Sequence, residues 1–262
     1  MNAKLFAIFI SFILFIGFPV QGRAEKDIQA AKDHTEELIN LSDRVFQYTD
    51  ANQDTAAFSL LNELSKEWDR SPQNYSDKDQ RVINTAIAKL KILMANSGED
   101  QREVTDAAVS LRLSFDALAP NGKPLWKNLH SEVVASVSKM KSAVKKKDHQ
   151  RFQYYLNEFL DKYAVVYPAM VIDGQSDAVS LVNKQINTLA DQRDKSLKTN
   201  VRIQQLTMIE HELNDVFDQS LKNNEESMVG LATVIGGIIV CVLAYTSWRR
   251  YVGERLRREH IR

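Results

Sequence analysis

The sequence predicts an all-α protein: an extracytoplasmic multi-helix bundle of antiparallel helical hairpins, plus one C-terminal transmembrane helix. Residues 25–228 contain only three glycines and four prolines, whereas an all-β chain has turn residues about every 8 to 12 positions. Apolar residues in this region recur at steps of three and four, which is the helical period. A third observation is an uncharged stretch of 19 residues near the C-terminus.

The first 24 residues have the pattern of a secretory signal peptide. Lys4 precedes an uncharged apolar run from Leu5 to Phe18, and Pro19 then breaks the run before the small residues Gly22 and Ala24. We expect cleavage after Ala24. An uncleaved anchor is the alternative, because a single lysine is a short basic region. Both readings place the residues that follow outside the cytoplasm.

Residues 25–228 form the predicted exterior domain, and they are acidic. They hold 26 Lys plus Arg against 32 Asp plus Glu, a net charge of about −6, which argues against a nucleic-acid-binding domain. The single cysteine, Cys241, lies beyond this domain. No internal disulfide can form there, so the domain must be stabilised by core packing, and its length allows one sizeable core.

Polar breaks and the few Gly and Pro residues divide the exterior domain into eight predicted helices with short connections. Ser76 followed by Asp79 resembles a capping box with Asp in place of Glu, which marks the start of the third helix. Short connections favour antiparallel neighbours. The predicted helices are 27–48, 54–70, 77–96, 99–119, 125–145, 148–172, 176–195, and one from about 200 that continues towards the membrane.

A weak internal repeat favours a division of these helices into four plus four. The segments "LNELSKEW" (Leu61–Trp68) and "LNEFLDKY" (Leu156–Tyr163) share three identities in eight positions, and both end on an aromatic residue. Both follow a polar turn after a long helix. Chance similarity between amphipathic helices is the alternative to an ancestral duplication.

Two sequence patterns resemble metal sites, but neither has the full set of residues that such a site needs. "DANQD" places Asp50, Asn52 and Asp54 like the first ligands of a calcium loop, but Thr55 replaces the required glycine and Leu61 the bidentate glutamate. We expect a solvated turn capped by Asp54.

The histidines show no paired Glu-x-x-His motif of the kind that builds a helical di-metal site. His34 has Glu37 one turn away, and His211 lies between Glu210 and Glu212, whose side chains diverge on a helix. We expect exposed histidines, no metal and no cofactor.

One predicted helix carries an aromatic stripe, and the helix before it carries a lysine run. The stripe is either a wall for ligand stacking or, as the spacing favours, a core-facing surface, and Pro168 should kink or terminate its helix. The lysines either contact anionic wall polymer or lipid or, as we favour, form a solvated helix end. The stripe is Phe152, Tyr155, Phe159, Tyr163 and Tyr167, and the run is Lys139, Lys141, Lys145, Lys146 and Lys147.

Residues 229–248 form the predicted transmembrane helix, because 19 residues at about 1.5 Å each cover the hydrocarbon core of a bilayer. A buried core helix is the alternative. Tyr245 and Trp248 occupy the interfacial position, and residues 249–262 form a basic tail that should face the cytoplasm. The tail's topology-determining arginines are Arg249, Arg250, Arg255, Arg257 and Arg258, with Arg262 at the end, against Glu254 and Glu259.

Small residues repeat at four-residue intervals within this span, which allows close approach of two membrane helices and weak self-association. Their general abundance in such helices is the alternative explanation. The possible packing face comprises Ala232, Gly236, Thr233, Gly237 and Cys241.

The whole layout resembles the sporulation protein YpjB family of endospore-forming bacteria. The resemblance includes "LNELSKEW" and "GLATVIGGIIVCVLAYTSWRRY" and covers the whole chain. It implies a role in sporulation, in the mother-cell membrane. These segments are not motifs with known chemistry, so the resemblance assigns no catalytic residue.

Two functional classes fit these observations. The favoured one is a membrane-anchored, non-enzymatic interaction or structural protein whose helical bundle docks another membrane or extracytoplasmic sporulation protein. The alternative is a sensor-like ligand-binding domain that signals through a partner, because the short tail contains no output domain of its own. No nucleophile elbow, phosphate loop or Cys-x-x-Cys occurs in the sequence, so we expect no enzyme and no catalytic or cofactor-binding residue.

Overall fold

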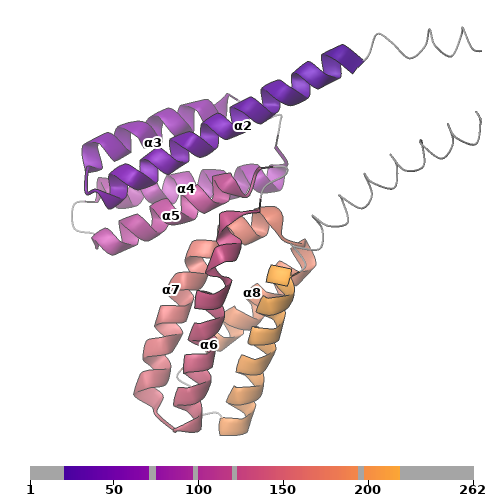
Figure 1. Cartoon of the computed structure of the whole chain (residues 1–262). Helices are drawn as coiled ribbons and strands as arrows, with labels where there is room; N and C mark the ends of the chain where they lie inside the picture. The colour runs from indigo at the N-terminus through magenta and orange to yellow at the C-terminus, as the bar shows by residue number, and fades with distance from the viewer. Residues whose placement is uncertain (1–20, 71–74, 97–99, 120–122, 194–197, 219–262) are drawn as a thin grey trace, which may run out of the picture.

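The computed structural model describes residues 21–70, 75–96, 100–119, 123–193 and 198–218, and every regular element within them is a helix (Figure 1). The all-α prediction is therefore confirmed for this part of the chain. None of the described helices is both long enough and apolar enough to cross a membrane. Residues 1–20 of the predicted signal peptide, the predicted span 229–248 and the tail 249–262 lie outside the described residues.

The helices form two groups that stack end to side (Figure 1). The first bundle contains α2 (Gln21–Asp50), α3 (Asp54–Asp69), α4 (Asp77–Ala95) and α5 (Gln101–Asp116). The second bundle contains the 3-10 helix η2 (Leu125–Leu129), α6 (His130–Lys145), α7 (His149–Asp173), α8 (Ser176–Asp191) and an unlabelled last helix, residues 199–218. Short connections make sequential neighbours antiparallel, as predicted.

Each bundle has its own hydrophobic core, so the predicted division into four plus four helices matches the packing. The first core joins α2 to α5 around Leu38, Leu61 and Phe115. The second joins η2 to the last helix around Trp126 and Phe159. The expectation of one core for the exterior domain was too coarse. The chain is long enough to bury two.

The two repeated segments occupy corresponding places in the two bundles. Leu61–Trp68 lies in α3 and Leu156–Tyr163 in α7, the second α-helix of each bundle. Their apolar positions are buried in matching order: Leu61 and Leu156, then Leu64 and Phe159, then Trp68 and Tyr163. The repeat thus records equivalent core positions.

The aromatic stripe of α7 packs in the second core, as favoured from its spacing. Phe152, Phe159 and Tyr163 are buried, while Tyr155 and Tyr167 pack against the core from its edge. Pro168, which was expected to kink or terminate this helix, does not terminate it: α7 continues to Asp173, close to the predicted end at residue 172. A proline removes one backbone donor from a helix, and core contacts on both sides of Pro168, from Val166 and Met170, hold the following turn in place.

One predicted helix cap agrees with the structure, one does not, and one predicted helix is divided in two. Ser76 caps α4, its hydroxyl accepting from the Asp79 N–H at 3.2 Å. Asp54 does not cap α3: the N-cap is Gln53, and Asp54 is the first helical residue. The predicted helix 125–145 divides at His130 into η2 and α6.

Candidate functional site

The two bundles join where α5 crosses α7. Leu111 and Phe115 of α5 belong to the first core, while Leu113 and Ala117, at and just beyond the end of the same helix, belong to the second. The Lys78 ammonium of α4 also donates to the backbone carbonyl of Ile172 in α7, at 3.3 Å. The junction is therefore a packed contact between helices that are distant in the sequence.

The helix η2 is clamped at this junction. Trp126 is fully buried, donates from its indole N–H to Asp173 at 3.2 Å and packs on Phe217 of the last helix, with ring centroids 4.7 Å apart. His130 shares a hydrogen bond of 2.7 Å with the Asn214 side chain. The last helix, which leads towards the predicted membrane span, is thus fastened to the junction.

Three adjoining hollows follow the junction, and we call them together the junction groove. The apolar end, of about 300 Å³, lies between α4 and α7 over α5. The middle section, of about 340 Å³, shares Lys89, Ser110 and Ala164 with it. The α6 end, of about 250 Å³, shares Arg102 and Asp161 with the middle section. The shared residues make the three hollows continuous.

The apolar end of the junction groove combines apolar walls with two cations. No carboxylate occurs among the described residues that line it, and neither the Arg81 nor the Lys89 side chain forms an ion pair within the described part of the chain. Lys89 also borders the middle section, where its charge opposes the rise in the pKa of Asp106. Its lining comprises Arg81, Val82, Thr85, Ala86, Lys89, Ala107, Ser110, Ala164, Tyr167, Pro168 and Val171.

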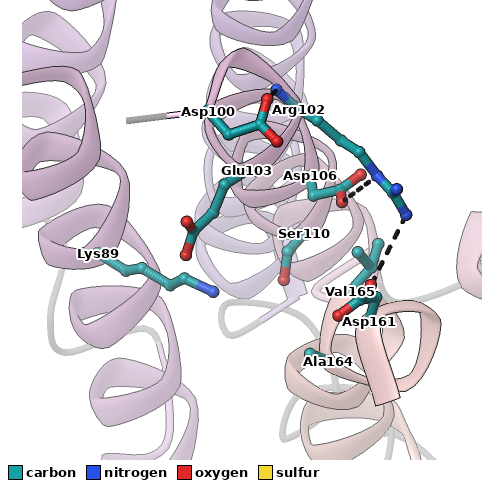
Figure 2. Close-up of a pocket in the computed structure, with 9 residues that line it drawn as sticks. All are labelled: Lys89, Asp100, Arg102, Glu103, Asp106, Ser110, Asp161, Ala164 and Val165. Atoms are coloured by element: carbon teal, nitrogen blue, oxygen red, sulfur yellow. Dashed lines mark hydrogen bonds and ion pairs between the residues drawn. The ribbon is translucent and has the colours of Figure 1, made fainter. Parts of the chain in front are cut away.

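The middle section is acidic. Figure 2 shows Asp100, Glu103 and Asp106 of the α5 region on one side, with Asp161 of α7 opposite. The Arg102 guanidinium bridges α5 to α7, 3.8 Å from Asp106 and 3.7 Å from Asp161. Its side chain is 68% exposed, so these ion pairs contribute little to stability.

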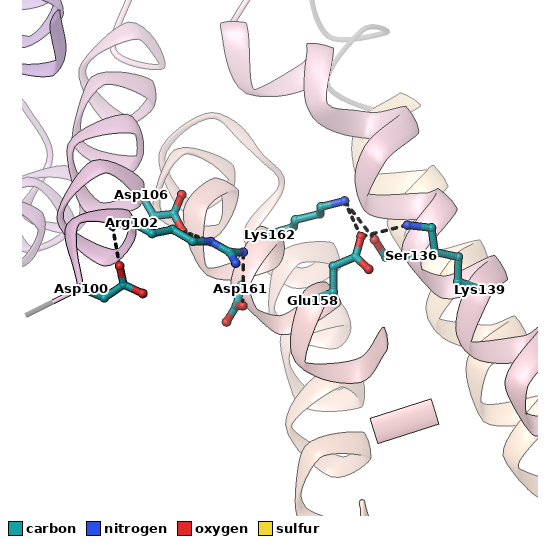
Figure 3. A network of polar contacts seen from close by, with 8 residues as sticks. All are labelled: Asp100, Arg102, Asp106, Ser136, Lys139, Glu158, Asp161 and Lys162. Atoms are coloured by element: carbon teal, nitrogen blue, oxygen red, sulfur yellow. Dashed lines mark hydrogen bonds and ion pairs between the residues drawn. The ribbon is translucent and has the colours of Figure 1, made fainter. Parts of the chain in front are cut away.

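Electrostatics differ between the middle section and the neighbouring α6 surface. Burial raises the pKa of Asp106, and the nearby Asp161 carboxylate adds to this effect while Arg102 opposes it. Hydrogen bonds from Lys139 and Lys162 lower the pKa of Glu158 (Figure 3). Glu158 is therefore paired with two lysines, whereas Asp106 and Asp161 share Arg102 and Lys89 acts on Asp106.

The lysine run divides between two roles. Lys139 pairs with Glu158 of α7 at 2.9 Å, and Lys141 pairs with Glu210 of the last helix. Lys145, Lys146 and Lys147 are exposed at the end of α6, as expected of a solvated helix end.

The suggested metal ligands do not converge in the described part of the chain. No group of three or more His, Cys, Asp or Glu side chains there could hold a metal ion. His34 lies 3.8 Å from Glu37, and His211 lies 2.9 Å from Asp215 rather than from its neighbouring glutamates. The segment at Asn52 is an interhelix turn, in which that residue adopts a φ of 55°.

Of the groove residues, Tyr167 and Pro168 had been singled out from the sequence, in the aromatic stripe and as the residue that kinks or terminates its helix, but the charged residues of the groove had not. They come from α4, α5, α6 and α7, and no local pattern reports which helices will cross. The residues that were singled out for membrane packing and topology lie outside the described residues. They are Ala232, Thr233, Gly236, Gly237, Cys241, Arg249, Arg250, Arg255, Arg257 and Arg258.

Comparison with known sequences identifies the family. The sequence model of the family described as "Sporulation protein YpjB (SpoYpjB)" matches residues 35–260, most of the chain. The chain belongs to this family. Over 232 residues it is 25% identical to "Uncharacterized protein YpjB" of Bacillus subtilis (strain 168), covering 86% of this chain and 88% of that protein. No solved structure matches the chain. The predicted membership of the sporulation protein YpjB family is confirmed.

Proposed function

We propose that this sporulation protein is anchored in the cell membrane by residues 229–248 and acts without catalysis, by docking a partner protein outside the membrane. The observation that carries the proposal is the junction groove, an open, continuous surface that combines apolar walls with two cations, Arg81 and Lys89, that form no ion pair among the described residues. Surfaces of this composition suit recognition of another chain, because apolar contacts supply affinity and charges supply selectivity.

The polar groups of the groove support docking more than catalysis. Ser110 contributes a hydroxyl, but no histidine or cysteine is among the described residues that line the three hollows. The hydroxyl therefore has no imidazole beside it to act as a general base. Arg102 lies beside Asp106 and Asp161 and opposes the rise in the pKa of Asp106 that burial causes.

A sensor-like role is the second candidate, and one contact favours it. Phe217 of the last helix packs on η2, Asn214 bonds to His130 at the start of α6, and Leu129 at the end of η2 lines the α6 end of the groove. A ligand in the groove would therefore lie next to the element that holds the last helix. In this version the bundle transmits binding to a partner in the membrane.

The anchoring and its direction are tested with reporter fusions. A reporter that is active only outside the cytoplasm is expected to work after Lys222 and to be silent after Arg262, because the arginines that follow the apolar stretch favour the cytoplasmic side. The reverse pattern would contradict the proposed topology.

The docking role is tested in sporulating cells. Ala164 is exposed and lines both the apolar end and the middle section, so Ala164→Trp fills the groove without entering a core. The variant is expected to lower the yield of heat-resistant spores. Lys184→Trp, at an exposed position of α8 outside the groove, is the matched control. Equal spore yields at equal protein levels would contradict docking through the groove.

A further inference from the structure

The apolar end of the junction groove has the shape of a short slot between two helices. Its lining residues on α7 extend from Ala164 to Val171, and those on α4 from Arg81 to Lys89. At 1.5 Å per residue each wall is roughly 10 to 12 Å long, which is about two turns of a helix. An amphipathic helix presents its apolar side chains over the same distance, at positions i, i+3, i+4 and i+7.

Charge selects among the helices that could enter this slot. Arg81 and Lys89 stand at opposite ends of the α4 wall, two turns apart, and neither forms an ion pair among the described residues. Lys89 stands at the end next to the middle section, where it also acts on the Asp106 carboxylate. A partner that brought lysine or arginine beside them would be repelled, whereas a partner with carboxylates beside its apolar stripe would pair with both.

The middle section makes the groove dipolar. It carries Asp100, Glu103, Asp106 and Asp161 against Lys89 and Arg102, so its charge is opposite to that of the apolar end. A lipid with an anionic headgroup suits only the apolar end and is repelled by the neighbouring carboxylates. A peptide can match both, because its side chains change sign along the chain.

We infer that the apolar end of the junction groove binds an amphipathic helix of the partner protein, whose apolar stripe lies between α4 and α7 and whose flanking carboxylates pair with Arg81 and Lys89. This inference rests on the proposed docking function and names the chemistry of its partner. The last turn of the bound helix lies towards the middle section. Basic residues in that turn would pair with Asp100 and Glu103.

Two stapled peptides of about 14 residues, roughly four helical turns, serve as probes of the full chain in detergent micelles. Both carry the same stripe of leucine and alanine. One has glutamates beside the stripe and the other has lysines at the same positions. We expect the glutamate peptide to bind at least roughly tenfold more tightly, measured by fluorescence anisotropy at moderate salt, since exposed charge pairs weaken as salt rises.

Charge reversal on the protein provides the matched test. Lys89→Glu is expected to weaken binding of the glutamate peptide roughly five- to tenfold and to strengthen binding of the lysine peptide. Lys184→Glu makes the same change at an exposed position of α8 and should alter neither affinity. Because one variant must gain a ligand as it loses another, misfolding cannot produce the expected pattern.

Two results would overturn the inference. One is an unchanged preference in Lys89→Glu, which would place the peptide elsewhere. The other is displacement of the glutamate peptide by a soluble short-chain phosphatidylglycerol at equal concentration, which would make the groove a lipid site. Neither result contradicts the docking function if Ala164→Trp still lowers spore yield. Failure of the helix inference can therefore be distinguished from failure of the proposed docking function.

Discussion

At one pair of equivalent core positions, the two bundles differ in whether the polar atom of a buried aromatic side chain has a hydrogen-bond partner. Trp68 of the first bundle donates its indole N–H to the Asn84 side chain at 2.8 Å. Tyr163 of the second bundle is 5% exposed, and its hydroxyl has no hydrogen-bond partner among the described residues. Burial also raises the pKa of this hydroxyl. The first bundle thus gives the polar atom at this position a hydrogen bond, whereas the second bundle buries a hydroxyl without one, which lowers the stability of the fold.

The bundles also differ in how they meet the junction. The first bundle contributes α4 and α5, whose outward faces form groove walls. The second contributes α7, which supplies the opposite wall, and η2, which fixes the last helix. The two bundles therefore contribute different elements to the junction.

The largest expected effect tests whether η2 holds the second bundle together. Trp126→Ala removes a fully buried indole that contacts Phe217 and Asp173, and it should lower the free energy of unfolding by about 3 to 5 kcal/mol. Denaturant unfolding followed by circular dichroism measures the loss. Ile92→Ala, at a residue 61% exposed, should cost less than about 1 kcal/mol. If Trp126→Ala and Ile92→Ala lowered the free energy of unfolding equally, η2 would not be what holds the second bundle together.

The next prediction addresses the equivalent positions directly. Trp68→Phe loses indole volume and a hydrogen bond and should cost about 1 to 3 kcal/mol. Tyr163→Phe removes a buried hydroxyl without a partner and should be neutral or stabilise the protein by up to about 1 kcal/mol. Thermal unfolding of both variants measures the difference. If Tyr163→Phe proved as costly as Trp68→Phe, the polar contrast between the bundles would be incorrect.

A smaller effect is expected at the exposed link between the bundles. Arg102→Ala removes its ion pairs with Asp106 and Asp161, and the free energy of unfolding should fall by less than about 1 kcal/mol, with the difference shrinking as salt is added. A loss above roughly 2 kcal/mol in denaturant titrations would show that the bundles are held together by charge rather than by α5 packing.

The smallest effect is a pH dependence at Asp106. Burial raises the pKa of this carboxyl above its unfolded value, so its ionised form slightly destabilises the folded protein at neutral pH. Asp106→Asn should therefore be slightly more stable than the parent near pH 7. This advantage should disappear as the pH falls through the folded pKa to below the unfolded one. A stability advantage of Asp106→Asn that grows as the pH falls would contradict this prediction.

The helix limits were predictable because they depend on local chemistry. Ser76 starts α4 as expected, and the predicted second, third and sixth helices agree with α3, α4 and α7 to within one residue at each end. Pro168 lies inside α7, as the predicted range 148–172 requires, because tertiary contacts outweigh one lost backbone bond. The predicted helix 125–145 was in error, because it divides at His130 into η2 and α6. Its start at Leu125 is fixed by Asp116, which accepts from the Leu125 N–H.

The groove could not be predicted in the same way. Lys89 and Asp161 are ordinary exposed charges on separate helices, and only the crossing of α5 over α7 places them in one hollow. The repeated segments gave the most useful long-range signal, since they marked the core face of α3 and of α7. The α7 residues that line the groove lie beside this core face, and no sequence repeat marks them.

Site-specific photocrosslinking in sporulating cells tests the central claim most directly. A photoreactive residue is placed at Thr85 or Ala164, on opposite walls of the apolar end, and at Lys184 of α8 as the control. The account predicts that one and the same partner protein is captured from Thr85 and from Ala164 and is not captured from Lys184. Capture from Lys184 alone, or equally from all three positions, would contradict docking in the junction groove.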